Sequence, residues 1–336
     1  MEFNFFTFIF LFAILTSVLA LLWLNFRQDK AIKSSFNEVP EDFKETITLE
    51  EHQKAGHYTQ AKLLANHFEV IFSTIVLLIW TLGGAMNWLD IFWHERISDP
   101  ILLGTVFILS IMLIASFIDL PFSIYRNFIL EDKFGFNRMT IKTFVGDLAK
   151  ELILALALGM PLIYAILYLM NMSAIGDYWW LYVWAILSLF TITMMWIYPA
   201  FIAPIFNKFI PLENNSLRSR IDNLLNRTGF GSDGIFIMDG SKRSSHGNAY
   251  FTGIGRNKRI VFFDTLLKGM EDEEIEAILA HELGHFHHKH VRQRIVSSFI
   301  FSLVSLALLG YLIKQGWFFH GLGISDPSNY TALVLF

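Results

Sequence analysis

Long apolar runs alternate with polar connections along most of the chain. A helix that crosses a lipid bilayer needs about 20 mostly apolar residues, and six runs reach that length: residues 5–24, 70–89, 101–120, 152–171, 179–199 and 296–313. The fourth and fifth runs contain Gly159, Pro161 and Pro199, which favour kinks and leave a buried core helix as the alternative there. The pattern predicts a mainly α fold, a polytopic α-helical membrane protein with six complete spans.

The segment at residues 200–295 has a different pattern, which is typical of a small α+β domain. Residues 215–228 predict an amphipathic helix whose apolar face holds Leu217, Ile221, Leu224 and Leu225. Three strand-like runs follow, at residues 234–238, 249–254 and 259–263, and the last two are joined by a plausible hairpin turn. A long helix is then predicted from Asp272 to beyond His290, with acidic residues first and basic residues last, as a helix dipole favours.

Composition supports a membrane protein and narrows the chemistry. Of the 336 residues, 54% are hydrophobic and 17% are charged, whereas soluble domains have about 45–50% apolar and about 25% charged residues. The absence of cysteine excludes a disulfide scaffold and thiolate metal ligands. A net charge of −4 gives no indication of a nucleic-acid partner, so the lipid bilayer is the first partner that we expect.

Basic residues fall almost entirely on one side of the predicted membrane. All lysines and arginines except Arg96 and Lys314 lie between the first and second, the third and fourth, or the fifth and sixth spans. The positive-inside rule makes that side cytoplasmic. We therefore expect a multi-pass protein with residues 200–295 in the cytoplasm and a non-cytoplasmic N-terminus. The first run lacks a basic leader and a cleavage site, so a signal peptide is disfavoured.

The strongest chemical motif is His281-Glu282-Leu283-Gly284-His285 in the long predicted helix. Residues four apart lie on one helix face, so His281 and His285 can ligate a single Zn²⁺ ion. Glu282 is placed to act as the general base, and zinc lowers the pKa of its bound water toward ~7. This is the H-E-x-x-H signature of zinc metalloproteases. The alternative is a solvated charged helix that happens to contain histidines.

The predicted zinc site is incomplete within this sequence. Catalytic zinc usually has three protein ligands, yet no glutamate follows His285 and the only later aspartate is Asp326. His288 would lie about 10.5 Å along the helix axis from His281, too far to share one ion easily. His287 and His288 are interpreted as solvated or outer residues, and His290 as at most an orienting residue.

The predicted spans and the motif together indicate three parts of the chain. Residues 1–199 form the membrane domain with spans one to five, residues 200–295 the zinc-protease domain, and residues 296–336 the sixth span and the start of a seventh. The last apolar run, residues 330–336, is too short to cross a bilayer. We therefore expect this sequence to be a C-terminally truncated version of a longer protein.

Several segments together resemble the type-1 CAAX prenyl protease family. Besides the motif at residues 281–285, they are residues 131–137, 204–209, 240–251 and 258–266. The resemblance covers most of the chain, from the second span to the sixth. Its motifs are much more specific than H-E-x-x-H alone.

The resemblance implies a seven-span enzyme with a water-filled chamber and a gluzincin-like zinc domain. Such an enzyme removes the last three residues from C-terminally prenylated proteins by zinc peptide hydrolysis, in a bacterial inner membrane or the endoplasmic reticulum. It further implies that Asn248 and Ala249 bind the substrate backbone, which an exposed strand edge does by β-augmentation. A turn residue before a strand is the alternative for Asn248, and His246 has the weaker case because it also suits a turn cap.

The sequence departs from that family in one respect. A seventh span, a glutamate as third zinc ligand, and further histidine and arginine residues that stabilise the oxyanion are all absent from these 336 residues. We therefore expect the isolated polypeptide to bind zinc weakly and to turn over slowly.

Three other functions remain as alternatives at this point. A protease without prenyl specificity would degrade or trim other membrane proteins. An intramembrane site-2-type protease would carry its motif inside a span, but the charged flanks at residues 271–274 and 289–294 argue against this. A non-catalytic membrane scaffold would retain the motif without a third ligand.

Overall fold

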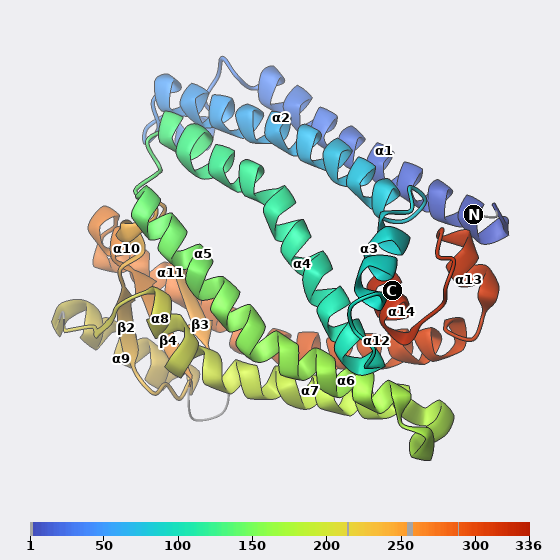
Figure 1. Ribbon diagram of the computed structural model, residues 1–336. Helices are drawn as coiled ribbons and strands as arrows, with labels where there is room; N and C mark the ends of the chain where they lie inside the picture. Colours follow the sequence, from blue (N-terminus) through green and yellow to red (C-terminus); the bar gives the residue numbers. More distant parts are fainter. Residues whose placement is uncertain (1–2, 214, 254–257, 288) are drawn as a thin grey trace. The chain divides into compact units, whose positions relative to one another are not determined.

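A computed structural model describes residues 3–213, 215–253, 258–287 and 289–336 (Figure 1). The chain packs as two compact units. Unit 1 comprises Met1–Phe134, Ile163–Asn171 and Leu309–Phe336, and unit 2 comprises Gly135–Leu162 and Met172–Leu308. The predicted domain boundaries at residues 199 and 295 stay a prediction.

Six helical stretches of the described chain are long and apolar enough to cross a membrane, which confirms the predicted fold class. They are Phe5–Ser34, Leu49–Trp80, Pro100–Glu131, Ile141–Asn171, Ser173–Phe206 and His290–Leu312. Only 6–22% of the most apolar window of each stretch is buried within the protein. Apolar side chains exposed on this scale need another apolar solvent, which the lipid bilayer provides.

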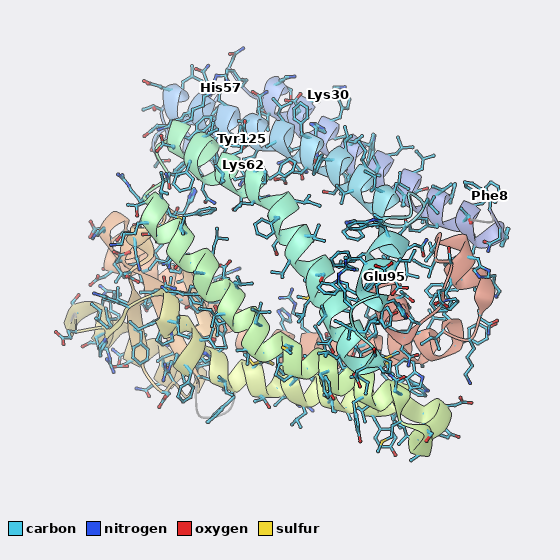
Figure 2. All side chains as sticks on the ribbon, in the orientation of Figure 1. Phe8, Lys30, His57, Lys62, Glu95 and Tyr125 are labelled. Carbon is cyan, nitrogen blue, oxygen red and sulfur yellow. The ribbon has the colours of Figure 1, made fainter. Side chains whose placement is uncertain are left out.

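Unit 1 is helical and is built around paired helices. Its elements are α1 (Phe5–Ser34), η1 (Glu41–Phe43), α2 (Leu49–Trp80), α3 (Ala85–His94), α4 (Pro100–Ile124), the π-helical η2 (Tyr125–Glu131), α13 (Gly316–Gly321) and α14 (Asn329–Leu335). The helices α1 and α2 pack side by side. Figure 2 shows Lys30, His57 and Lys62 toward the end of this pair where the two helices are joined, and Phe8 at the opposite end. Basic side chains thus gather at one end of this unit.

Unit 2 contains the remaining long helices and the sheet. Its helical elements are α5 (Ile141–Leu154), η3 (Ala155–Gly159), α6 (Met160–Asn171, shared with unit 1), η4 (Ser173–Tyr178), α7 (Trp179–Ile197), η5 (Tyr198–Ile202), α8 (Ala203–Phe206), α9 (Asn215–Thr228), η6 (Gly240–Lys242), α10 (Asp264–Gly269), α11 (Asp272–His287) and α12 (His290–Leu312). Both η3 and η5 are π-helical. They lie at the predicted kinks, because a π-helical turn relieves the backbone conflict that glycine and proline introduce into a long helix.

A four-stranded sheet forms the centre of the small α+β part. Its order is β1 (Phe209–Pro211), β2 (Ile235–Met238), β4 (Arg259–Phe263) and β3 (Ala249–Thr252). The β2–β4 pair is parallel, and the two outer pairs are antiparallel. The three predicted strands are confirmed, although the predicted hairpin turn falls largely on residues 254–257, outside the described residues. Strand β1 was not predicted, because three residues ending in proline carry too little periodicity.

The core of this part lies where α9 and α11 cover the sheet. The four predicted apolar residues of α9 are all buried there. From α11 come Ile275, Leu279 and Leu283, which are spaced four residues apart. This spacing places them on one face of the helix, so their packing fixes how α11 is rotated about its axis.

The long helix that was predicted to continue past His290 is interrupted, and that prediction is wrong at this point. Helix α11 ends at His287 and α12 begins at His290. Between them Lys289 has a φ of 57°, a left-handed conformation that an α-helix of L-residues cannot continue through. The chain direction therefore changes directly after the H-E-x-x-H motif.

Candidate functional site

The rotation of α11 decides where the motif side chains point. Because Leu279 and Leu283 face the core, the face of the helix that carries His281 and His285 is turned away from it. His281 is exposed and Glu282 is half-buried, at the margin between the two faces. The backbone of His285 continues the helix one turn beyond His281, while its side chain lies outside the described residues.

This arrangement supplies part of a metal site. Two imidazole positions one turn apart, in a chain without cysteine, form the nitrogen donor set that suits zinc. Among the described residues, no group of three or more histidine, aspartate or glutamate side chains is placed to hold an ion. The two imidazole positions on α11 therefore fit zinc and would supply two of its ligands.

Strand β3 is an edge of the sheet and presents backbone groups for an added strand. The carbonyl of Asn248 accepts the amide of Phe263 at 2.9 Å, which makes these two residues a hydrogen-bonded antiparallel pair. Such pairs alternate along the strand, so the N–H and C=O groups of Ala249 and Phe251 point away from β4. The amide of Ala249 donates instead to Oδ1 of Asn248, at 2.8 Å.

An open cavity brings the motif helix and this strand together. Helix α11 packs against β3, and a cavity of about 1040 Å³ is lined by Glu282 together with Tyr250, Phe251 and Thr252. Phe251 also packs against Phe230, at 5.1 Å between ring centroids. The carboxylate of the predicted general base and the predicted substrate strand therefore share one cavity.

Tyr250 adds a polar group to the wall of the cavity. Burial, with a smaller contribution from the neighbouring Tyr198, raises the pKa of Tyr250 to about 12. Its hydroxyl therefore stays protonated at neutral pH, and it donates to Sδ of Met238 at 3.8 Å. Both tyrosines line the cavity, and the sequence alone gave no indication of this role.

The loop that leads into β3 is held by an ion pair between two residues that are far apart in sequence. Arg243 contacts Oδ2 of Asp147 in α5 through Nε at 2.8 Å and through Nη2 at 2.7 Å. The same guanidinium donates to the carbonyl of Phe206 at 2.8 Å and to Oδ1 of Asn207. One side chain thus joins α5, the end of α8 and the loop before β3.

A second clamp holds the start of this loop against the first residue of α10. The Ser241 amide donates to Oδ1 of Asp264 at 2.8 Å, and its hydroxyl donates to Oδ2. Burial by itself would raise the pKa of Asp264, but these hydrogen bonds and the nearby Lys268 hold it below the ordinary value of 3.8. The carboxylate is therefore the form that fits the folded loop.

His246 lies within this loop and contacts the loop's neighbours. Its ring stacks on Phe136 with 4.3 Å between centroids. Its amide donates to Oγ of Ser244 at 3.2 Å, and its carbonyl accepts the hydroxyl of Thr265 at 2.8 Å. The structure therefore places His246 next to Asn248 and Ala249, in a position that orders the loop.

Sequence reasoning did not find the residues that hold the site. Arg243 lies within the stretch at residues 240–251, but its partner Asp147 is 96 residues away, so only the folded chain pairs them. The basic residues Lys289, Arg292 and Arg294 were interpreted as partners of a helix dipole and as part of a charged flank, not as part of the site. The structure instead places all three on the wall of the cavity that contains Glu282.

Comparison with known proteins adds independent information. Residues 28–208 match the family model described as the CAAX prenyl protease N-terminal region with five membrane helices, and residues 211–325 match peptidase family M48. The chain is 32% identical over 340 residues to CAAX prenyl protease 1 homolog of Caenorhabditis elegans, which covers 93% of this chain and 75% of that protein. It is 34% identical over 318 residues to CAAX prenyl protease 1 of Saccharomyces cerevisiae, which covers 90% of this chain and 68% of that protein.

A solved structure is also similar. The crystal structure of S. mikatae Ste24p matches with a TM-score of 0.87 and 30% sequence identity, over 100% of this chain and 81% of that chain. The matched region includes α11, β3 and all six candidate spans.

Proposed function

The chain belongs to the CAAX prenyl protease family of M48 peptidases, and on this premise we propose that it is a zinc-dependent endopeptidase that removes the C-terminal tripeptide from prenylated proteins. It is a multi-pass membrane protein and a peptidase that acts on peptide or protein substrates. The observation that carries the proposal is the shared cavity, in which Glu282 of the H-E-x-x-H helix lies beside the open edge of β3.

In this proposal His281 and His285 hold the zinc ion, together with a third ligand that is expected to be a glutamate. Zinc would act as a Lewis acid on the scissile carbonyl and make water a stronger acid. Glu282 takes a proton from the attacking water and delivers it to the leaving amine. Its position at the margin between the buried and exposed faces of α11 suits this role, because its carboxylate reaches the cavity while its backbone stays anchored.

The substrate binds as an added strand along β3. The outward carbonyl and amide of Ala249 supply main-chain hydrogen bonds, and Asn248 releases the Ala249 amide when the peptide arrives. His246 orders the loop before this strand through Phe136. The apolar wall formed by Met195, Ile295 and Val296 accepts hydrophobic side chains of the substrate.

The orientation follows the distribution of charge. Nearly all lysines and arginines lie in the connections that share one side of the predicted membrane. Lys30 lies near the joined end of α1 and α2, and Lys62 lies in the half of α2 nearer to that end (Figure 2). We propose that the peptidase site faces the cytoplasm, in a bacterial inner membrane or the endoplasmic reticulum.

Cleavage of a farnesylated C-terminal peptide by the intact protein in proteoliposomes tests the activity. Replacing the general base in Glu282→Gln should lower the rate by about 10²–10⁴-fold. Glu276→Gln is the matched control, because Glu276 is on the same helix and forms only a surface ion pair with Arg220. An unchanged rate in Glu282→Gln would remove this residue from its proposed role.

Metal content and substrate choice are tested separately. His281→Ala should lower the zinc content of the purified protein, measured by elemental analysis, whereas His52→Ala in the first turn of α2 should not. Comparing the farnesylated peptide with its unprenylated form and with an unrelated membrane-protein fragment tests prenyl specificity. Equal cleavage of all three would favour a quality-control protease without prenyl specificity.

A further inference from the structure

The cavity beside Glu282 is lined by two unlike kinds of side chain. The apolar ones, here called the apolar wall, include Met195, Val291, Ile295 and Val296. The basic ones, here called the basic wall, are Lys258, Lys289, Arg292 and Arg294. Among the described residues that line the cavity, Glu282 is the one acidic residue. Such a surface is complementary to a ligand that is largely apolar and carries a negative charge.

Three of these basic side chains have no acidic partner within the described part of the chain. Among the side chains that the structure describes, none forms an ion pair with Lys289, Arg292 or Arg294. Elsewhere in unit 2, by contrast, Arg220 pairs with Glu273 and Glu276. Three cations within six residues repel one another, and a low-dielectric apolar wall beside them strengthens the field that they direct into the cavity. An anion that enters the cavity relieves this repulsion.

The position of the cations relative to Glu282 suggests which anion the cavity binds. Helix α11 rises 1.5 Å per residue and ends at His287, so it carries the chain about 7.5 Å beyond Glu282, and Lys289 follows two residues later. Three residues of an extended peptide span about 10 Å, which is a comparable length. A peptide whose scissile bond is at Glu282 would therefore bring its end close to the basic wall, if three residues follow that bond.

The backbone at this point is also held in an unusual conformation. Lys289 adopts a φ of 57°, which is uncommon for a residue other than glycine and costs free energy. This turn interrupts what would otherwise be a continuous helix and redirects the chain where the basic segment begins. The turn lies at the start of the basic segment that lines the cavity containing Glu282.

We propose that Lys289, Arg292 and Arg294 bind the free α-carboxylate of the substrate, so that the cavity selects for a chain end about three residues beyond the scissile bond. The inference rests on the proposed function and names the residues that determine its positional specificity. The carboxylate is the charged group of the ligand, and the adjacent apolar wall accepts the hydrophobic side chains that precede it.

The test combines two substrates with substitutions in the basic wall. The intact protein in proteoliposomes cleaves a farnesylated peptide with a free C-terminus and the same peptide with a C-terminal amide. The amide should lower kcat/KM by about 10–100-fold, which is the range expected for lost charge-assisted hydrogen bonds. The triple variant K289Q/R292Q/R294Q should cleave the free acid as slowly as the amide and should cleave the amide as fast as the unmodified protein does.

Controls separate this role from folding and from membrane contact. The rate on the amide peptide reports whether the triple variant is folded, and Arg227→Gln changes a basic residue of unit 2 that does not line the cavity. Equal cleavage of acid and amide by the unmodified protein would overturn the proposal. So would a triple variant that loses both activities equally, or one whose defect appears only in vesicles of anionic lipid and is the same for both peptides.

The outcomes also distinguish this inference from the proposed function. If Glu282→Gln abolishes cleavage while acid and amide are cleaved alike, the peptidase mechanism stands and the carboxylate site is rejected. If Glu282→Gln has no effect, the proposed mechanism itself is rejected, whatever the two peptides show.

Discussion

Arg243 and Asp147 form a double contact in which two guanidinium nitrogens, Nε and Nη2, reach the same carboxylate oxygen at 2.8 and 2.7 Å. Their side chains are 21% and 12% exposed, so water screens the pair only partly. Arg243 stands three residues before His246 in the loop that leads into β3, and Asp147 stands in α5. The pair therefore fixes the start of the proposed substrate strand to a helix of the fourth candidate span.

Removing this contact should destabilise unit 2 and slow catalysis. Arg243→Ala leaves Asp147, in a partly buried site, with the longer contact to Lys150 at 3.4 Å in place of the double contact, and we expect a loss of about 3 kcal/mol in the free energy of unfolding. Arg243→Lys should recover only part of this, because an ammonium group cannot reach Asp147, Asn207 and the Phe206 carbonyl together. Denaturant unfolding in detergent measures the loss.

The matched control for this pair is Arg218→Ala. Arg218 pairs with Asp222 four residues along α9 at the surface, and exposed pairs of this kind contribute up to about 1 kcal/mol. Equal losses in Arg218→Ala and Arg243→Ala would show that the Arg243 contact is not a special feature of the loop.

The Ser241–Asp264 clamp predicts a specific dependence of stability on pH. The pKa of Asp264 is held below 3.8 in the folded protein, so between the folded and unfolded values the unfolded chain binds more protons. The stabilisation is therefore present above about pH 4 and is lost as the pH falls through the folded pKa. The difference in unfolding free energy between the unmodified protein and Asp264→Asn should be largest near neutral pH and shrink toward about pH 3. A difference that does not change with pH would contradict the clamp.

The edge of β3 allows a proline test of substrate binding. The amide of Ala249 points away from β4, so Ala249→Pro should keep the β3–β4 ladder and change the stability by less than about 1 kcal/mol. It removes one donor to an added strand and should lower kcat/KM by about tenfold. Tyr250→Pro is the contrasting variant, since residue 250 pairs with Val261 in the ladder, and its loss should destabilise the sheet. Full activity in Ala249→Pro would argue against strand addition at this position.

Gly284 predicts opposite changes in stability and activity. A Cβ at this position would meet no other atom of the described structure within 4 Å, so Gly284→Ala should stabilise α11 by about 0.8–1 kcal/mol. The new methyl group lies one residue before His285, where metal and substrate need space, and peptide cleavage should fall. Ala277→Gly, one turn before His281 on the same helix, should cost a similar amount of stability and leave the rate unchanged, because it adds no atoms near the motif. A faster Gly284→Ala enzyme would show that this space is not used.

Local patterns were sufficient to predict the parts of this fold that depend on periodicity. The six spans, the apolar face of α9 and the motif of α11 each depend on residues within one element. The helix break at Lys289 could not be predicted, because lysine is a good helix former and only tertiary packing holds its left-handed backbone. Strand β1 is too short to show alternation, and it pairs with β2 from 25 or more residues away.

The residues of the candidate site also fall into two groups: those that sequence spacing indicates and those that only the fold brings together. His281, Glu282 and His285 are neighbours on one helix, so their spacing alone suggested their common role. The Arg243–Asp147 pair and the basic wall depend on which segments the fold brings together, and sequence periodicity carries no information about such contacts. Only a stretch such as residues 240–251, which resembles the known family, indicated that the loop before β3 matters.

The Arg243–Asp147 contact also links a candidate membrane span mechanically to the proposed substrate strand. Asp147 lies in the second turn of α5, at the start of a candidate span, and its guanidinium partner lies six residues before β3. A bilayer whose thickness changes the tilt of α5 should therefore move the proposed substrate strand, without any change in the proposed zinc ligands. Rates measured in vesicles of increasing acyl-chain length should vary in the unmodified protein and vary less in Arg243→Ala, in which the link is cut.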